Sequence, residues 1–191
     1  MQEVFYEESV STTNVSKNKV KYYIVKVIAI ISIIIGVLMT FFFLLFVNLS
    51  NMFQLIFFGI ILIGSYVIGF VYLRKKDAFL LDFDYTFVSG SVRISKVLNN
   101  KRRRPVLSFN TSDIIQLGKY QSNTFEKIIK DTTNKKIIAT PNECAAEGKD
   151  FYYIHLTAKG LKHILILECS ETFMYNVLKF SSKTVLEPDF K

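Results

Sequence analysis

The sequence predicts an α+β membrane protein, with an N-terminal two-helix transmembrane hairpin, an antiparallel β domain and a closing C-terminal helix. Half of the residues are hydrophobic although the formal net charge is +8, which is unusual for a soluble domain of this length. The segment from Val27 to Leu73 contains no Asp, Glu, Lys, Arg or His. After this segment, apolar residues recur at the two-residue period of β-strands, and the period becomes helical only near the end.

The uncharged segment is long enough for two membrane helices, because one crossing takes about 20 apolar residues. Its only polar cluster is NLSN, Asn48–Asn51, which predicts helices at Tyr22–Val47 and Met52–Leu73. So short a connection makes the two helices antiparallel. A cleaved signal peptide is the alternative for the first helix, but its apolar run exceeds the roughly 7 to 15 residues of a signal-peptide core.

The flanking charges predict the orientation of this hairpin. Lysines precede the first helix and Arg74, Lys75 and Lys76 follow the second, whereas NLSN carries no charge. Positively charged flanks remain in the cytoplasm, so we expect a multi-pass protein of the cell membrane with both termini cytoplasmic. The predicted parts are an N-terminal cytoplasmic segment at 1–21, the hairpin at 22–73 and a cytoplasmic β domain at 77–191.

Small residues indicate how the two helices pack, because small side chains four residues apart let helix backbones approach closely. The predicted packing residues are Ser32, Gly36, Gly59, Gly64, Ser65 and Gly69. Glycine is also common in membrane helices without any packing role. No ionisable residue lies within the predicted bilayer region, which argues against a proton relay, a channel or a transport pathway.

The remaining chain reads as consecutive strands. Apolar residues from Phe79 to Phe87 alternate with Asp82, Asp84 and Thr86, and Ser89-Gly90 is a plausible turn. Further strands are predicted from Val106 and on both sides of a turn at 158–160, whereas the order of 121–150 is left open. Ser170 then caps an amphipathic helix.

Meandering strands closed by a C-terminal helix resemble the pleckstrin-homology (PH) superfold. The segments VFYEE, DYTFVSGSVRISKVLNNKRRRPVLSF and KGLKHILILECSETFMYNVLK, together with the two apolar runs, are similar to a bacterial family of Firmicutes membrane proteins, domain of unknown function 6106. The resemblance covers most of the chain except 121–150. It implies a PH-like domain and a membrane location, but no activity, cofactor or catalytic residue.

Four consecutive cations, Lys101, Arg102, Arg103 and Arg104, are predicted to form a turn between two strands. Such a turn must face water or an anionic partner, because it cannot bury its charges. The anionic cytoplasmic leaflet is one partner, and a purely solvated turn is the alternative. Nucleic acid is not expected, because the sequence has no RNP-like aromatic motif and no helix-turn-helix pattern.

Few other residues have side chains suited to metal binding or catalysis. Asp82 and Asp84 share one strand face, a spacing that suits a shared cation, but the pattern is weak by itself and the polar face of an amphipathic strand explains it without a metal. His155 and His163 flank one turn and are potential cross-strand neighbours. They lack enough further ligands for a metal site, and the two cysteines, Cys144 and Cys169, are not expected to form a disulfide in the cytoplasm.

The sequence therefore predicts a non-catalytic, membrane-tethered binding or scaffolding module that needs no cofactor. The expected partners are the bilayer, its anionic headgroups, and a protein partner or second copy bound at a strand edge or beside the C-terminal helix. One alternative is a small accessory subunit that packs through the hairpin on a larger membrane complex. Another is a metal-dependent enzyme that uses Asp82 and Asp84.

Overall fold

The computed structural model describes residues 3–46, 51–181 and 185–188. The chain divides into two units, one formed by Met1–Thr13 with Leu81–Lys191 and the other by Asn14–Leu80. Most of the predicted NLSN loop and the predicted helix end at Val47 lie outside the described residues. Asn51 is described, and its side chain caps the second helix by accepting a hydrogen bond from the Gln54 N–H.

The helical unit contains α1 (Val15–Phe46), α2 (Met52–Lys75) and the short 3-10 helix η1 (Lys76–Phe79). Both long helices are apolar enough and long enough to cross a membrane, and only 11% and 6% of their most apolar windows are buried. They are therefore unlike the core helices of a soluble protein. The first helix begins seven residues before the predicted Tyr22, because lysine is a good helix former and does not end a helix.

Gly36 and Gly69 lie where α1 and α2 pack against each other. A Cβ atom at Gly36 would be 2.9 Å from the Ser65 Oγ, and one at Gly69 would be 2.6 Å from the Ile33 Cγ1. The predicted packing positions Gly59 and Gly64 differ, because a Cβ there would meet no atom within 4 Å. These two glycines therefore do not lie at a close contact between the helices.

The remaining packing positions contribute hydroxyl groups to their own helices. The Ser32 Oγ donates to the Ile28 carbonyl and the Ser65 Oγ donates to the Leu62 carbonyl. Each hydroxyl thereby forms a hydrogen bond within its own helix. Ser65 also faces Gly36, so its small size matters for the close approach of the helices.

We expect Gly69→Val to weaken the packing of α1 on α2 by roughly 1–3 kcal/mol, because an added side chain overpacks the contact with Ile33. Gly64→Val is the matched control, since it makes the same chemical change where space is open. SDS titration of the full chain, followed by circular dichroism, measures the difference. Equal midpoints for the two variants would contradict the assigned contact.

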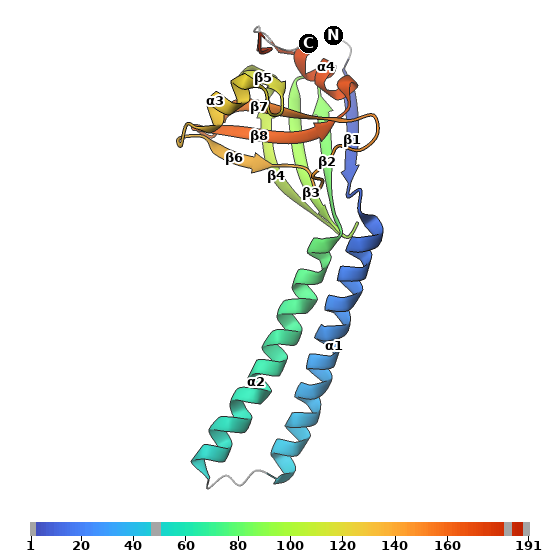
Figure 1. Cartoon of the computed structure of the whole chain (residues 1–191), viewed down its shortest axis with the longest axis vertical. Helices are drawn as coiled ribbons and strands as arrows, with labels where there is room; N and C mark the ends of the chain where they lie inside the picture. Colours follow the sequence, from blue (N-terminus) through green and yellow to red (C-terminus); the bar gives the residue numbers. More distant parts are fainter. Residues whose placement is uncertain (1–2, 47–50, 182–184, 189–191) are drawn as a thin grey trace. The chain divides into compact units, whose positions relative to one another are not determined.

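The second unit is a pair of four-stranded sheets (Figure 1). Sheet A has the order β1-β2-β3-β4, and sheet B has the order β5-β7-β8-β6. The strands of sheet A are β1 (Phe5–Ser11), β2 (Leu81–Val88), β3 (Ser91–Leu98) and β4 (Arg102–Asn110). Those of sheet B are β5 (Ile114–Lys119), β6 (Lys135–Ile138), β7 (Asp150–Ala158) and β8 (Leu161–Cys169). The 3-10 turn η2 (Thr111–Asp113) connects the sheets.

One hydrophobic core lies between the sheets and includes the fully buried rings of Tyr85, Phe87 and Tyr152. Burial along β2 follows the predicted alternation, with Phe83, Tyr85 and Phe87 directed into the core. Burial raises the pKa of Tyr152 to about 12. The core is thus formed by both sheets, including Val10 of the first strand, which precedes the helices.

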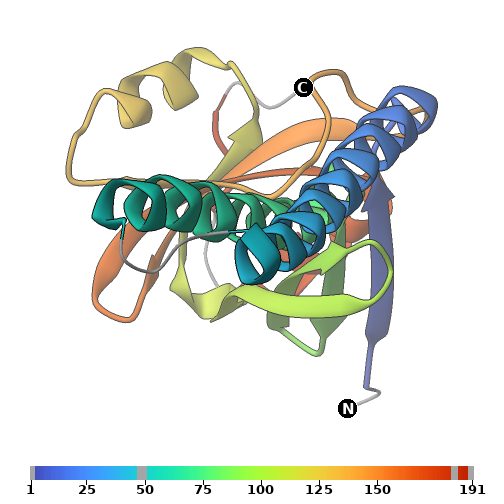
Figure 2. The same cartoon turned by 90° about the horizontal axis from the view of Figure 1, so that it is seen from below.

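Two helices cover this unit. Helix α4 (Glu171–Lys179) is capped by the predicted Ser170, whose side chain accepts from the Phe173 N–H, and it buries Phe173 in the core. Helix α3 (Asn123–Ile129) packs on the side of sheet B that faces away from sheet A, where Phe125 contacts a second, smaller cluster (Figure 2). The segment 121–150, whose order the sequence left open, thus contributes α3 and β6.

Strand β1 lies within the segment 1–21, to which the sequence analysis assigned no strand. It pairs along its whole length with β2, from Phe5 opposite Val88 to Ser11 opposite Asp82. The apolar hairpin is therefore an insertion between the first two strands of the β unit. The boundary predicted at residue 77 separates this strand from the unit to which it belongs.

The predicted turn at Lys101–Arg104 also differs from the observed one. Asn99 and Asn100 adopt positive φ angles of 51° and 52°, which asparagine tolerates better than most residues, and the turn ends at Lys101. Strand β4 begins at Arg102 and continues through Pro105. Proline is tolerated there because β4 is an edge strand with an irregular register opposite Ile94 and Ser95.

Candidate functional site

The candidate site is the end of sheet A that carries the cations Lys101–Arg104. Leu81 at the start of β2 is opposite Leu98, and Leu98 is in turn opposite Arg102. The end of β1 lies in the same row, because Ser11 pairs with Asp82. Both chain connections to the apolar hairpin therefore leave sheet A at the end where the cations lie.

Arg103 is already bound within this unit. Its guanidinium is 3.2 Å from the Asp84 carboxylate, and the Ser9 Oγ donates to the other oxygen of Asp84 at 2.7 Å. The side chain of Asp84 is only 8% exposed, whereas that of Arg103 is 70% exposed. Arg103 thus forms an ion pair with a carboxylate on the outer face of β2.

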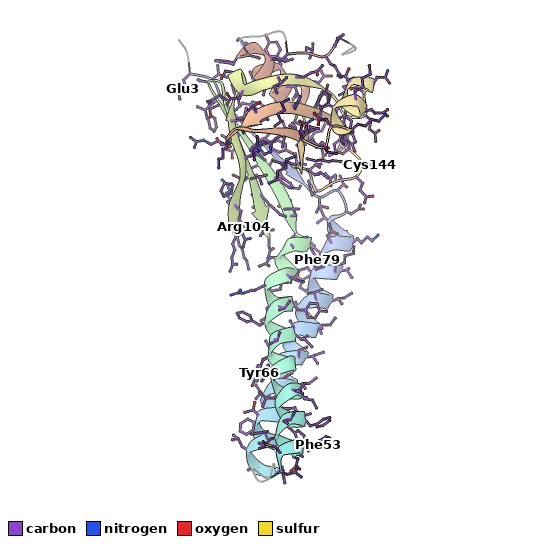
Figure 3. All side chains as sticks on the ribbon, turned by 90° about the vertical axis from the view of Figure 1, so that its left-hand side faces the viewer. Glu3, Phe53, Tyr66, Phe79, Arg104 and Cys144 are labelled. Atoms are coloured by element: carbon purple, nitrogen blue, oxygen red, sulfur yellow. The ribbon has the colours of Figure 1, made fainter. Side chains whose placement is uncertain are left out.

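Arg102 and Arg104 lie on the opposite face of β4 from Arg103, because side chains alternate along a strand. Lys96 is directly opposite Arg104, so two like charges face each other on the β3–β4 pair. Within the described parts of the chain, Arg102 and Arg104 have no ion pair, and both are exposed. Figure 3 shows Arg104 near one end of sheet A. Like charges in this position are unfavourable unless an anion joins them.

The two aspartates of the predicted D-x-D pattern are not equivalent. Asp82 is partly buried, whereas Asp84 is held by Ser9 and Arg103. A shared cation would have to displace the Arg103 guanidinium from Asp84. The described residues contain no group of three or more His, Cys, Asp or Glu side chains that is placed to hold a metal ion.

The two histidines do not share a face. His155 is opposite Ile164 and His163 is opposite Leu156, so the expectation of cross-strand neighbours is wrong. The pairs are offset by one residue, and a shift of one residue changes the face. Burial and then the nearby Lys162 lower the pKa of His155, which favours the neutral ring at physiological pH.

The two cysteines differ in their burial. Cys144 is exposed and Cys169 is buried in the core, and both are free thiols. Burial raises the pKa of Cys169 well above its ordinary value. A buried thiol that remains protonated is a poor nucleophile.

Three buried or nearly buried carboxylates were not predicted from the sequence. Glu8 on β1 accepts hydrogen bonds from the N–H and Oγ of Ser170 and forms an ion pair with Lys149 at 2.9 Å. It thereby connects the first strand to the cap of α4. Glu168 and Glu187 are 0% and 3% exposed.

Glu168 organises the connection between β6 and β7. It accepts from the Thr140 Oγ at 2.6 Å, the Asn142 side-chain amide at 2.9 Å and the Ala146 N–H at 2.8 Å. Asn142 also binds the end of β1, because its amide donates to the Ser11 carbonyl. No local pattern indicates these contacts, since the partners lie more than 20 residues apart in the sequence.

The β unit, two packed sheets closed by α4, is consistent with a PH-like domain, and an apolar helical hairpin is inserted between its first two strands. The chain belongs to the family of bacterial PH-like domains named DUF6106, which matches residues 2–187. This confirms the family that the sequence resembles. The comparisons with curated proteins and with solved structures give no match.

Proposed function

We propose that the protein is a membrane-tethered cytoplasmic binding module without catalysis of its own, and that its basic strand end orients it on anionic lipid headgroups. The proposal takes α1 and α2 as membrane-spanning, with both termini in the cytoplasm. Their length, their apolar composition and their exposed side chains support this. The cations that flank them support the orientation.

The observation that carries the proposal is the register of Leu81, Leu98 and Arg102 at one end of sheet A. Only Thr12–Asn14 separates β1 from α1, and only η1 and Leu80 separate α2 from β2. In a membrane-spanning hairpin, connections this short tether that end of the sheet to the bilayer surface. Tethering raises the effective concentration of the cations there, so a weak attraction is sufficient to orient the unit.

The attraction has a physical source in the exposed cations. Each Lys or Arg near an anionic surface contributes about 1 kcal/mol. One face of β4 carries Arg102 and Arg104, and Lys96 lies opposite Arg104 on β3. Arg103, on the other face, forms an ion pair with Asp84. A phosphate group between Lys96 and Arg104 would also relieve the repulsion of these two like charges.

The test uses the full chain in nanodiscs of phosphatidylcholine, with or without phosphatidylglycerol, and follows amide hydrogen exchange by mass spectrometry. We expect slower exchange at Asn99–Arg104 in the anionic nanodiscs at low salt. The R102Q/R104Q variant should lose this difference, and about 0.5 M salt should reduce it, because salt screens exposed charges.

The matched control is K127Q/K130Q, which removes two exposed cations from the region of α3. It should keep the lipid-dependent protection at Asn99–Arg104. Identical exchange in neutral and anionic nanodiscs at low salt would overturn the proposed orientation. Loss of protection in both variants would show that only net charge matters, and not the basic end of sheet A.

A further inference from the structure

Strand β4 has one residue more than its partner β3 at the irregular point in their register. Leu107 is opposite Ile94, whereas Pro105 is opposite Ser95, the next residue of β3. Val106 therefore has no partner, which defines a β-bulge. Because a shift of one residue moves side chains to the other face, the bulge changes the face of every residue of β4 that precedes it. Bulges are common next to functional sites, where they redirect a side chain.

The apolar contacts of Val106 explain why the bulge forms at this position. In a regular strand, Val106 and Leu107 would lie on opposite faces. In the structure, both are partly buried and both pack against the core between the sheets. A regular register would place Val106 opposite Ser95, in the row of the outer face that contains Asp84. The bulge thus keeps an apolar side chain against the core and away from a carboxylate.

The bulge also determines which cations share a face. In a regular strand, Arg104 would take the position that Arg103 has in the structure, on the outer face with Asp84. In the bulged strand, Arg103 takes this position and forms the ion pair with Asp84. Arg102 and Arg104 both lie on the other face, where Lys96 is opposite Arg104. The basic face, formed by Lys96, Arg102 and Arg104, therefore depends on the bulge.

The bulged register has an electrostatic cost that a regular register would avoid. Lys96 and Arg104 are directly opposite each other, and like charges in opposite positions destabilise a sheet. In a regular strand the uncharged Pro105 would be opposite Lys96. An anionic group between the two cations offsets their repulsion through charge-assisted hydrogen bonds. The arrangement therefore suits a chain that binds an anion at this face.

We propose that the bulge builds the surface that contacts anionic headgroups, with the three cations of the basic face as the contacting groups and Val106 as the residue that positions them. Arg103 lies outside this site, because its ion pair with Asp84 holds it on the outer face. The inference rests on the proposed function and extends it, since it states which cations contact the headgroups and which residue arranges them.

The experiment replaces Val106 and leaves every cation in place. Val106→Gln, in the full chain in nanodiscs, introduces a polar side chain that is costly to bury, so we expect β4 to adopt the regular register. The slower amide exchange at Asn99–Arg104 in anionic nanodiscs should then be lost, although the net charge is unchanged. Val106→Ile is the matched control, because it keeps an apolar, β-branched side chain at the bulge, and it should retain the lipid-dependent protection.

A second measurement follows the register without anionic lipid, by chemical denaturation in neutral nanodiscs. In the otherwise wild-type chain, Arg103→Gln should lower the midpoint, because Asp84 loses its cation, whereas Arg104→Gln should not. In the V106Q chain these two effects should be exchanged. A folded V106Q chain that keeps the original order would overturn the role of Val106. Exchanged effects in a protein that shows no lipid-dependent protection would overturn the lipid contact and leave Val106 as the residue that sets the register.

Single removals of a cation decide the matter if V106Q loses its folded circular dichroism spectrum. Lys96→Gln and Arg103→Gln each remove one positive charge from the β3–β4 pair, but from opposite faces. We expect K96Q to reduce the lipid-dependent protection at Asn99–Arg104 by about 5-fold, the contribution of one cation near an anionic surface. R103Q should leave it unchanged. Equal losses in the two variants would overturn the assignment of the basic face.

Discussion

A chain that lacks residues 1–13 is expected to lose its folded β unit, although these residues precede the two long helices. Their removal takes away β1, exposes the edge of β2 and withdraws Val10 from the core. It also leaves Ser170 and Lys149 without Glu8. Burial of one such side chain contributes about 1.5–3 kcal/mol, and each orphaned buried polar group costs about 1–3 kcal/mol.

The summed loss is comparable to the entire stability of a small domain, about 5–15 kcal/mol. The measurement compares two soluble chains by circular dichroism and thermal unfolding. One is Leu81–Lys191 alone, and the other joins Met1–Thr13 to Leu81–Lys191 through a short Asn/Gly linker in place of the hairpin. We expect only the second to unfold cooperatively. Cooperative unfolding of Leu81–Lys191 at the same temperature would contradict the role of β1.

The failure to predict β1 from the sequence has a physical reason. A half-buried strand is recognised by alternating apolar residues, but the inward positions of β1 are Tyr6, Glu8 and Val10. The charged residue in the middle breaks the pattern, and its partners Lys149 and Ser170 are more than 140 residues away in the sequence. By contrast, β2 and β3 were predictable, because their apolar positions alternate and Ser89-Gly90 supplies a turn with positive φ.

The conformation of the basic segment Lys101–Arg104 differs from the predicted one. The four adjacent cations before Pro105 predict a turn. In the structure, Asn99 and Asn100 adopt the turn conformation and β4 starts at Arg102. The difference between a turn and a strand matters for the proposed function, because successive side chains of a strand lie on opposite faces. Arg103 binds Asp84, whereas Arg102 and Arg104 remain available, and no pattern within this segment reveals the contact to Asp84.

Glu168→Ala is expected to lower the free energy of unfolding by about 3 kcal/mol or more. Glu168 is fully buried and accepts from Thr140, Asn142 and the Ala146 N–H. Its removal leaves these donors without their acceptor, at a cost of about 1–3 kcal/mol for each buried group that finds no water. Chemical denaturation of the full chain in nanodiscs measures the loss.

The location of the effect distinguishes this network from a general loss of packing. Because Asn142 also binds the Ser11 carbonyl and the Thr13 N–H, release of Glu168 should speed amide exchange both at Ala139–Lys149 and at the end of β1. Glu143→Ala is the matched control, since Glu143 is exposed and should change stability by no more than about 0.5 kcal/mol. Faster exchange confined to Ala139–Lys149 would show that Asn142 does not transmit the change. Faster exchange at both places would show that Glu168, through Asn142, stabilises the end of β1 against sheet B.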